Sequence, residues 1–186
     1  YRIEVDNRLE SGRHRARIDI AARRRLPAIT AEIEMLADLE SIQPLIVVLP
    51  IGDNRPLYTH KMPCPVRGEI RVGDRRIELD ETRHQVLIDV QKTFYPFDTT
   101  WRWATFGARD TEGRLLGINL VQNMIRDDER YNENVFWHDG RASLLGAARF
   151  THDRANLLAP WTIRTTDGRC ELTFTPEGER AGKVNL

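Results

Sequence analysis

Four runs of sequence decide the fold of this chain: WRWATFG at residues 101–107, RLLGINL at 114–120, NENVFWH at 132–138 and RASLLGAARF at 141–150. Each run is rich in aromatic or branched apolar residues, as β-strands are. Two of the turns between them, Glu112-Gly113 and Asp139-Gly140, end in glycine, and this combination is the strongest short-range signal of a β-hairpin. Residues 99–150 therefore predict a meander of four antiparallel strands.

The N-terminal third of the chain also has the alternating pattern of strands. Apolar and polar residues alternate with period two at residues 13–21 and again at 29–35, which predicts two strands of a sheet with one wet face. The run LIVVL at residues 45–49 predicts a strand that is buried on both faces. Pro63 and Pro65 are expected to interrupt the strand that follows.

Two further hairpins are predicted outside the meander. In the first, at residues 66–80, Ile70 and Val72 pair toward Ile77 and Leu79, and the second surrounds Asp167-Gly168. With another strand at residues 86–90, the pattern gives roughly eleven or twelve strands and no long helix. The predicted class is therefore all-β.

An antiparallel meander leaves two unpaired edges unless its sheet closes. Closure into an up-and-down β-barrel removes both edges, and a barrel of about eight strands encloses enough space for one small ligand. We therefore expect a β-barrel, with a β-sandwich as the alternative. Prolines and glycines between residues 50 and 65 predict a junction between a first barrel-like part, residues 1–62, and a second, residues 63–186.

Composition limits the partners and the location of the protein. Its 28 basic and 28 acidic residues cancel, so no net field attracts nucleic acid or an anionic membrane. The longest apolar run, residues 45–51, is too short for a transmembrane segment. Cys64 and Cys170 lack a partner spacing and predict reduced thiols in the cytoplasm. The excess of arginine over lysine indicates a bacterial source, and the start at Tyr1 predicts a piece of a longer protein.

The common signatures of catalysis and cofactor binding are missing from the sequence. There is no Gly-rich phosphate loop, no nucleophile elbow and no pair of Cys or His residues at metal-ligand spacing. The five histidines are scattered along the chain. We therefore expect no metal and no cofactor, and nothing in the sequence specifies an oligomeric state.

Trp101 and Trp103 share one face of their predicted strand, because side chains alternate along a strand. Two indoles on one face form a large apolar wall that carries two N–H donors. The pair is either part of the core, with its donors hydrogen-bonded, or the flat wall of a ligand pocket.

Polar residues lie within the same apolar strands. Asn119 needs a hydrogen-bond partner if it is buried, in the protein, in water or in a ligand. Glu133 and Asn134 point to opposite faces of their strand, and Asp89 lies between apolar neighbours. A carboxyl group beside a tryptophan is either an acid with a raised pKa or the partner of an arginine. Glu133 and Asp89 are therefore the catalytic candidates, and Asn119, Glu133 and Asn134 are candidates for ligand binding.

These residues belong to an ordered series of motifs that resembles the bacterial family grouped as domain of unknown function 2804. The matching motifs are Leu45 to Pro50, Tyr58-Thr59-His60-Lys61, Gly68-Glu69-Ile70, Asp89, Tyr95-Pro96, Trp101-Arg102-Trp103-Ala104, Gly117-Ile118-Asn119-Leu120, Glu133-Asn134, Asp139-Gly140, Pro160-Trp161 and Leu172-Thr173-Phe174-Thr175-Pro176. The resemblance adds Lys61 and Tyr95 to the ligand-binding candidates. The family in turn resembles lipocalin-like two-barrel proteins, among them carotenoid hydratases, AttH-like proteins and certain fungal cyclases. That similarity implies a lipocalin-like β-barrel with an apolar cavity.

Three functions remain open. The first is a carrier or sensor that holds a small apolar molecule against Trp101 and Trp103. The second is a hydratase, isomerase or cyclase in which Glu133 or Asp89 moves a proton on an apolar substrate. The third is a structural or interaction module whose barrel is filled by its own side chains. An open cavity with both tryptophans and a buried carboxylate favours the enzyme, the same cavity without a carboxylate favours the carrier, and a filled barrel excludes both.

Overall fold

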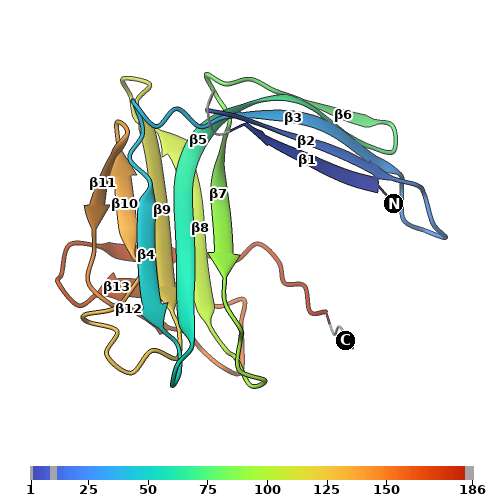
Figure 1. Ribbon diagram of the computed structural model, residues 1–186. Helices are drawn as coiled ribbons and strands as arrows, with labels where there is room; N and C mark the ends of the chain where they lie inside the picture. The colour runs from blue at the N-terminus through green and yellow to red at the C-terminus, as the bar shows by residue number, and fades with distance from the viewer. Residues whose placement is uncertain (1, 9–11, 183–186) are drawn as a thin grey trace.

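The computed structural model describes residues 2–8 and 12–182, which form fourteen β-strands in antiparallel sheets (Figure 1). The all-β prediction is confirmed, since these residues contain no helix. A seven-stranded sheet contains β1 (Arg2–Arg8), β2 (Arg13–Ile20), β3 (Ile29–Leu36), β4 (Leu45–Pro50), β5 (Pro56–Val72), β6 (Arg75–Leu79) and β7 (Gln85–Lys92). A four-stranded sheet contains β8 (Arg102–Arg109), β9 (Leu115–Gln122), β10 (Val135–His138) and β11 (Arg141–Leu144), and a three-stranded sheet contains β12 (Ala148–Thr151), β13 (Trp161–Thr165) and β14 (Glu171–Phe174).

The long strand β5 joins two parts of the seven-stranded sheet. Its first half pairs with β4 and β7, and its second half pairs with β3 and β6. The strands β1, β2, β3 and β6 consequently extend to one side as a separate wing (Figure 1). The junction predicted between residues 62 and 63 falls within β5, and the assignment of its two sides to barrel halves stays a prediction.

The expected interruption of this strand at Pro63 and Pro65 was wrong. Both prolines lie within β5, opposite Leu87 and Gln85 of β7. On the other side of β5, the pairing with β4 ends at Lys61 and the pairing with β3 begins at Val66. The prolines occupy the gap between these two partners, where a missing N–H costs the sheet no ladder hydrogen bond.

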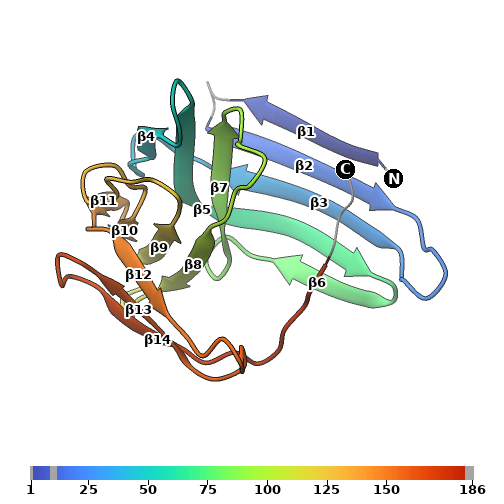
Figure 2. The same ribbon diagram turned by 90° about the horizontal axis from the view of Figure 1, so that it is seen from below.

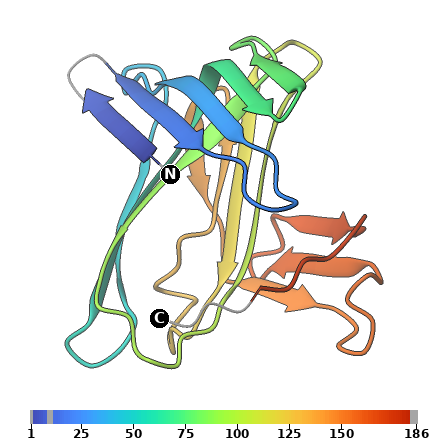
Figure 3. The same cartoon turned by 90° about the vertical axis from the view of Figure 1, so that its right-hand side faces the viewer.

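The four-stranded sheet packs against the β4-β5-β7 half of the larger sheet (Figure 3). Leu45 of β4 and Leu87 of β7 meet Val135 and Trp137 of β10 in one buried cluster. The three-stranded sheet covers the opposite face of β9 and β10, where Ile118 and Leu120 pack against Ile163 (Figure 2). The fold therefore has three layers beside the wing, and the middle layer is covered on both faces at β9 and β10.

The predicted meander is confirmed, with the strand order β11-β10-β9-β8. Asp139 and Gly140, which join β10 and β11, have φ angles of 50° and 75°, as a two-residue hairpin turn requires. The run at residues 141–150 is divided between β11 and β12, which lie in different sheets. Within the described residues no strand pairing closes any of the three sheets, so the protein is an all-β fold of packed antiparallel sheets.

Two expectations about individual strands need correction. The strand at residues 45–49 is not buried on both faces, because Ile46 and Val48 are 55% and 60% exposed. They point away from the four-stranded sheet, and that outer face of β4 has no covering layer in the described part of the chain. In the hairpin of β5 and β6, Ile70 faces Ile77 as predicted, but Val72 lies opposite Arg75, and Leu79 lies opposite Gly68.

The two cysteines are free thiols, as expected, with Cys64 buried and Cys170 partly buried. Burial raises the pKa of the Cys64 thiol to about 12, so the thiol is uncharged at neutral pH. In residues 2–8 and 12–182 we find no helix with the length and apolar character that crossing a membrane requires.

Hydrogen bonds of Gln43, which precedes β4, hold the seven-stranded sheet against the hairpin of β10 and β11. The carbonyl oxygen of Gln43 accepts a hydrogen bond of 2.8 Å from the Trp137 indole, and its N–H donates to the carbonyl of Gly140 at 2.8 Å. The Gln43 side chain accepts a further bond from the Ala142 N–H. The turn at Gly140 also lies so close to Ser41 that a Cβ atom at Gly140 would be 2.0 Å from the Ser41 carbonyl oxygen.

The Gly140→Ala variant should therefore be much less stable than Gly168→Ala. Both glycines have a positive φ angle, 75° and 70°, but nothing lies within 4 Å of a Cβ atom at Gly168. The backbone strain of about 1–2 kcal/mol is common to both variants, and the clash adds about 2 kcal/mol at Gly140 alone. Urea unfolding measures the difference, and equal midpoints for the two variants would contradict the close contact.

Candidate functional site

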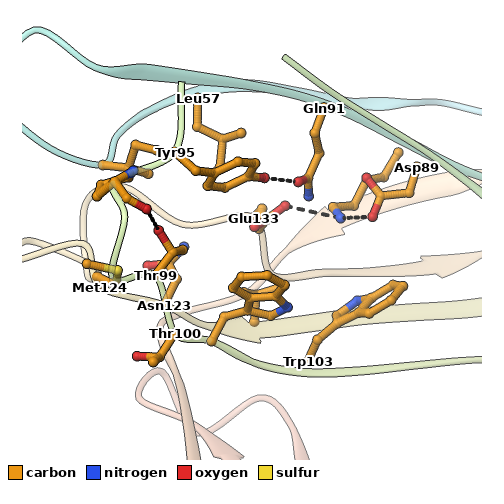
Figure 4. A pocket seen from close by; sticks show the side chains of 15 residues that line it. Leu57, Asp89, Gln91, Tyr95, Thr99, Thr100, Trp103, Asn123, Met124 and Glu133 are labelled. Carbon is orange, nitrogen blue, oxygen red and sulfur yellow. Dashed lines mark hydrogen bonds and ion pairs between the residues drawn. The ribbon is translucent and has the colours of Figure 1, made fainter. Parts of the chain in front are cut away.

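A cavity of about 180 Å³ lies between the β4-β5-β7 half-sheet and the four-stranded sheet (Figure 4). Strands of both sheets and two loops supply its lining residues, which are Ile51, Leu57, Lys61, Asp89, Gln91, Tyr95, Pro96, Thr99, Thr100, Trp101, Trp103, Val121, Asn123, Met124 and Glu133. Six of the sequence candidates are in this set, and Asn119 contacts two of its members. Residues far apart in the sequence therefore meet at one place.

A buried lysine lies at the centre of the polar part of the site. Lys61 on β5 is opposite Asp89 on β7 in the strand register, so the two side chains share a face of the sheet. The Lys61 ammonium is 1% exposed and donates a 2.6 Å hydrogen bond to Oδ2 of Asp89. It also lies 5.4 Å from the centre of the Trp103 ring, a position in which the face of an indole attracts a cation.

Glu133 approaches the same ammonium from the other sheet. It lies two residues before β10, its side chain is 3% exposed, and its Oε2 is 3.3 Å from Nζ of Lys61. This contact lacks hydrogen-bond geometry, and Oε2 has no hydrogen-bond partner within the described residues. Burial raises the pKa of Glu133, the nearby Asp89 raises it further, and the charge of Lys61 opposes both. Glu133 is thus a buried acid that keeps its proton to a higher pH than an ordinary glutamate does.

Asn119 positions the aromatic wall of the cavity. It is fully buried on β9, and its Oδ1 accepts a 2.8 Å hydrogen bond from the Trp103 indole. Its Nδ2 donates a 2.8 Å bond to the carbonyl of Glu133. The partner that the sequence required for Asn119 is therefore the protein itself, and one amide fixes both the Trp103 ring and the backbone that carries Glu133.

Trp101 and Trp103 line the cavity and are 59% and 48% exposed, so they do not form a buried core pair. Trp101 stacks on Tyr95, with ring centres 6.2 Å apart and an angle of 24° between the planes. The Tyr95 hydroxyl donates a hydrogen bond to the side chain of Gln91. Burial, followed by the charges of Glu133 and Asp89, raises the pKa of Tyr95, and its hydroxyl stays protonated at neutral pH.

The strand predicted at residues 132–138 begins only at Val135, so Asn134 lies just before β10; it is outside the lining of the cavity and fully buried. Its Oδ1 accepts a 2.6 Å bond from the Val121 N–H, and its Nδ2 donates a 3.0 Å bond to the carbonyl of Gly146. Both groups of its amide are used by the backbone, so the structure gives Asn134 a role in connecting strands.

Sequence reasoning did not single out four of the loop residues that line the cavity. Thr99 and Thr100 come from the segment between β7 and β8, and Asn123 and Met124 follow β9. Thr99 is held by a 2.6 Å hydrogen bond from its hydroxyl to the carbonyl of Pro96. One signal was present in the sequence, since residues 94–97 contain three aromatic residues in a loop next to Trp101, and binding residues are common in loops.

No group of three or more metal-ligating side chains occurs in the part of the chain that the structure describes. Comparison with known proteins finds a family model, Domain of unknown function (DUF2804), that matches residues 1–186. No curated protein and no solved structure matches the chain.

Replacement of Lys61 by methionine should destabilise the protein strongly, because it leaves the buried Glu133 and its neighbour Asp89 without their cation. We expect a loss of about 3–5 kcal/mol at pH 7. The loss of the ammonium raises the pKa of Glu133 further above its unfolded value, so the folded variant gains stability as the pH falls through that pKa. The deficit measured by urea unfolding should therefore be smaller at pH 5 than at pH 7.

Lys92→Met is the matched control, since Lys92 is an exposed residue of the same strand as Asp89. Its unfolding free energy should stay within about 0.5 kcal/mol of the unaltered protein. A Lys61→Met protein with equal losses at pH 5 and pH 7 would contradict the coupling between Lys61 and the carboxyl groups.

Proposed function

Since the chain belongs to the family Domain of unknown function (DUF2804), whose description assigns no reaction, we propose a function from the site alone. The protein binds a small, largely apolar molecule in its cavity, and Glu133 gives a proton to that molecule or takes one from it. The observation that carries this proposal is a buried carboxyl group with a raised pKa that lines a cavity walled by two tryptophans.

The size of the cavity limits the bound molecule. An apolar cavity of about 150 Å³ accommodates benzene, and the cavity here has a volume of about 180 Å³. One ring or a short branched chain therefore fits inside, and a longer molecule extends past the half-exposed Trp101 and Trp103. The side chains of Ile51, Leu57 and Val121 provide apolar contacts for the enclosed part.

The acid and the aromatic rings together favour proton transfer over simple storage. A carrier needs the cavity but has no use for a buried carboxyl group, which lowers stability when it ionises. A hydratase or isomerase protonates a double bond and creates a positive charge, which the faces of Trp101 and Trp103 stabilise. The contacts of Lys61 with Asp89 and Glu133 fix the positions of the charged groups in the site. The cavity also counts against the third function, a module filled by its own side chains.

The finer predictions about fold and location are part of the same proposal. Two sheets that face each other around a ligand cavity form the kind of architecture from which a lipocalin-like barrel is built. The free thiols of Cys64 and Cys170 agree with a reducing compartment such as a bacterial cytoplasm.

The proposal is tested first by native mass spectrometry of the protein purified gently from its own source. A stoichiometric small molecule that is released on denaturation is the expected result. That compound is then incubated with the protein in D₂O, where proton transfer appears as a gain of deuterium or as addition of water. A protein without a bound molecule, and a compound that gains no deuterium, would each count against the proposal.

The Glu133→Gln variant should retain binding of the released compound. Its rate of deuterium incorporation should be about 10²–10⁴-fold lower than that of the unaltered protein. The amide has the size of the carboxyl group but does not transfer a proton. Glu177→Gln is the control, because Glu177 is exposed and lies outside the cavity, and its rate should equal that of the unaltered protein. Full-rate incorporation by Glu133→Gln would remove Glu133 from the mechanism.

A further inference from the structure

The charged groups of the cavity are unequal in number. Its lining contains one cation, Lys61, and two acidic residues, Asp89 and Glu133. Lys61 already contacts both carboxyl groups, at 2.6 Å and 3.3 Å, and is therefore saturated as an ion-pair partner. An anionic ligand finds no further positive side chain among the described residues of this lining.

One oxygen of the lining has an ion-pair contact but no hydrogen bond. Glu133 is 2% exposed, and its Oε2 lies 3.3 Å from Nζ of Lys61 but accepts no hydrogen bond from any described residue. A buried oxygen without a hydrogen bond is costly, and more so when it is charged. Figure 4 shows the Glu133 carboxyl group inside the cavity, between Asp89 and Tyr95. A ligand that donates an N–H to this oxygen would satisfy it.

The aromatic residues provide the second, independent feature. Trp101, Trp103 and Tyr95 each line the cavity, and Trp101 and Tyr95 stack on each other. The Trp103 ring already has the Lys61 ammonium at 5.4 Å from its centre. Aromatic faces beside a carboxylate are the arrangement by which proteins bind organic ammonium groups.

We infer that the polar part of the ligand is a small organic cation, an ammonium group on an apolar or aromatic body, with the Glu133 carboxylate as its counter-ion. The inference rests on the proposed function, because it names the chemical class that the same cavity takes. The ammonium lies between Glu133 and the tryptophan faces, and the apolar body contacts Leu57 and Val121.

An uncharged amine also becomes this cation on binding. The Glu133 carboxyl proton moves to the amine nitrogen, which gives an ammonium and a carboxylate without any other reactant. The titratable neighbours of Glu133 are Lys61 on β5, Asp89 on β7 and Tyr95 in the following loop. The new positive charge balances the second carboxylate, which Lys61 alone does not neutralise.

Isothermal titration at pH 7 with three probes of the same size tests the inference. The probes are benzylammonium, benzyl alcohol and benzoate, which differ in charge and share one ring. Benzylammonium should bind at least about tenfold more tightly than benzyl alcohol, since the face of an indole attracts a desolvated cation but not a neutral alcohol. Benzoate should bind more weakly than both.

Variants separate the contributions of the two features. Glu133→Gln should bind benzylammonium and benzyl alcohol within about threefold of each other, because the counter-ion is lost and the cavity remains. Trp101→Leu should weaken benzylammonium binding by about three- to fivefold. Because Trp101 is exposed, we expect this variant to fold. Phe97→Leu is the control in the same loop, since Phe97 is fully exposed and outside the lining.

The outcomes distinguish this inference from the proposed function. If the unaltered protein binds benzyl alcohol as tightly as benzylammonium, or prefers benzoate, the inference is wrong. The proposal that the cavity binds a small, largely apolar molecule is then unaffected. If none of the three probes binds, the cavity does not take small molecules and both proposals fail. A preference for benzylammonium that persists in Glu133→Gln would overturn the role of Glu133 as the counter-ion.

Discussion

The site depends on one buried ammonium group that is shared by two sheets. Lys61 is 1% exposed, and its Nζ contacts Asp89 of its own sheet and Glu133 of the facing one. Burial of an ion costs several kcal/mol, which only close and well-oriented partners offset. β5, β7 and the segment before β10 must therefore keep one relative position, because a shift of one residue would turn Lys61 or Asp89 to the outer face.

The rest of the architecture keeps this position. β5 is long enough to belong to both the wing and the layered part, and its prolines lie where neither β4 nor β3 needs a hydrogen bond. Gln43 connects the approach to β4 with the hairpin of β10 and β11 through three hydrogen bonds. The third sheet covers the far face of β9 and β10. β9, which carries Asn119, and β10, which follows Glu133, are therefore enclosed on both sides.

Local patterns in the sequence predicted the parts of the fold that depend on neighbouring residues. The Asp139-Gly140 turn, the meander and the demand of Asn119 for a partner all follow from short-range chemistry, and the structure agrees with them. The contact of Lys61 with Asp89 did not follow, because β6 separates β5 from β7 in sequence. The pairing of these two strands is a long-range contact, and the alternation of apolar and polar residues along each strand does not predict it. The same limit applies to Ile46 and Val48, whose apolar side chains indicated burial although no described layer covers them.

Glu133 and Asn134 have opposite roles in the segment just before β10. Glu133 lines the cavity, whereas Asn134 is buried in the interior of the protein. The interior position holds an amide, whose donor and acceptor are both satisfied by backbone groups. The cavity position holds a carboxyl group whose Oε2 lacks a hydrogen bond from the described residues. A protein selected for stability alone would favour an apolar residue there. The presence of an acid at this position, despite its cost in stability, is the physical argument behind the ligand-binding proposal.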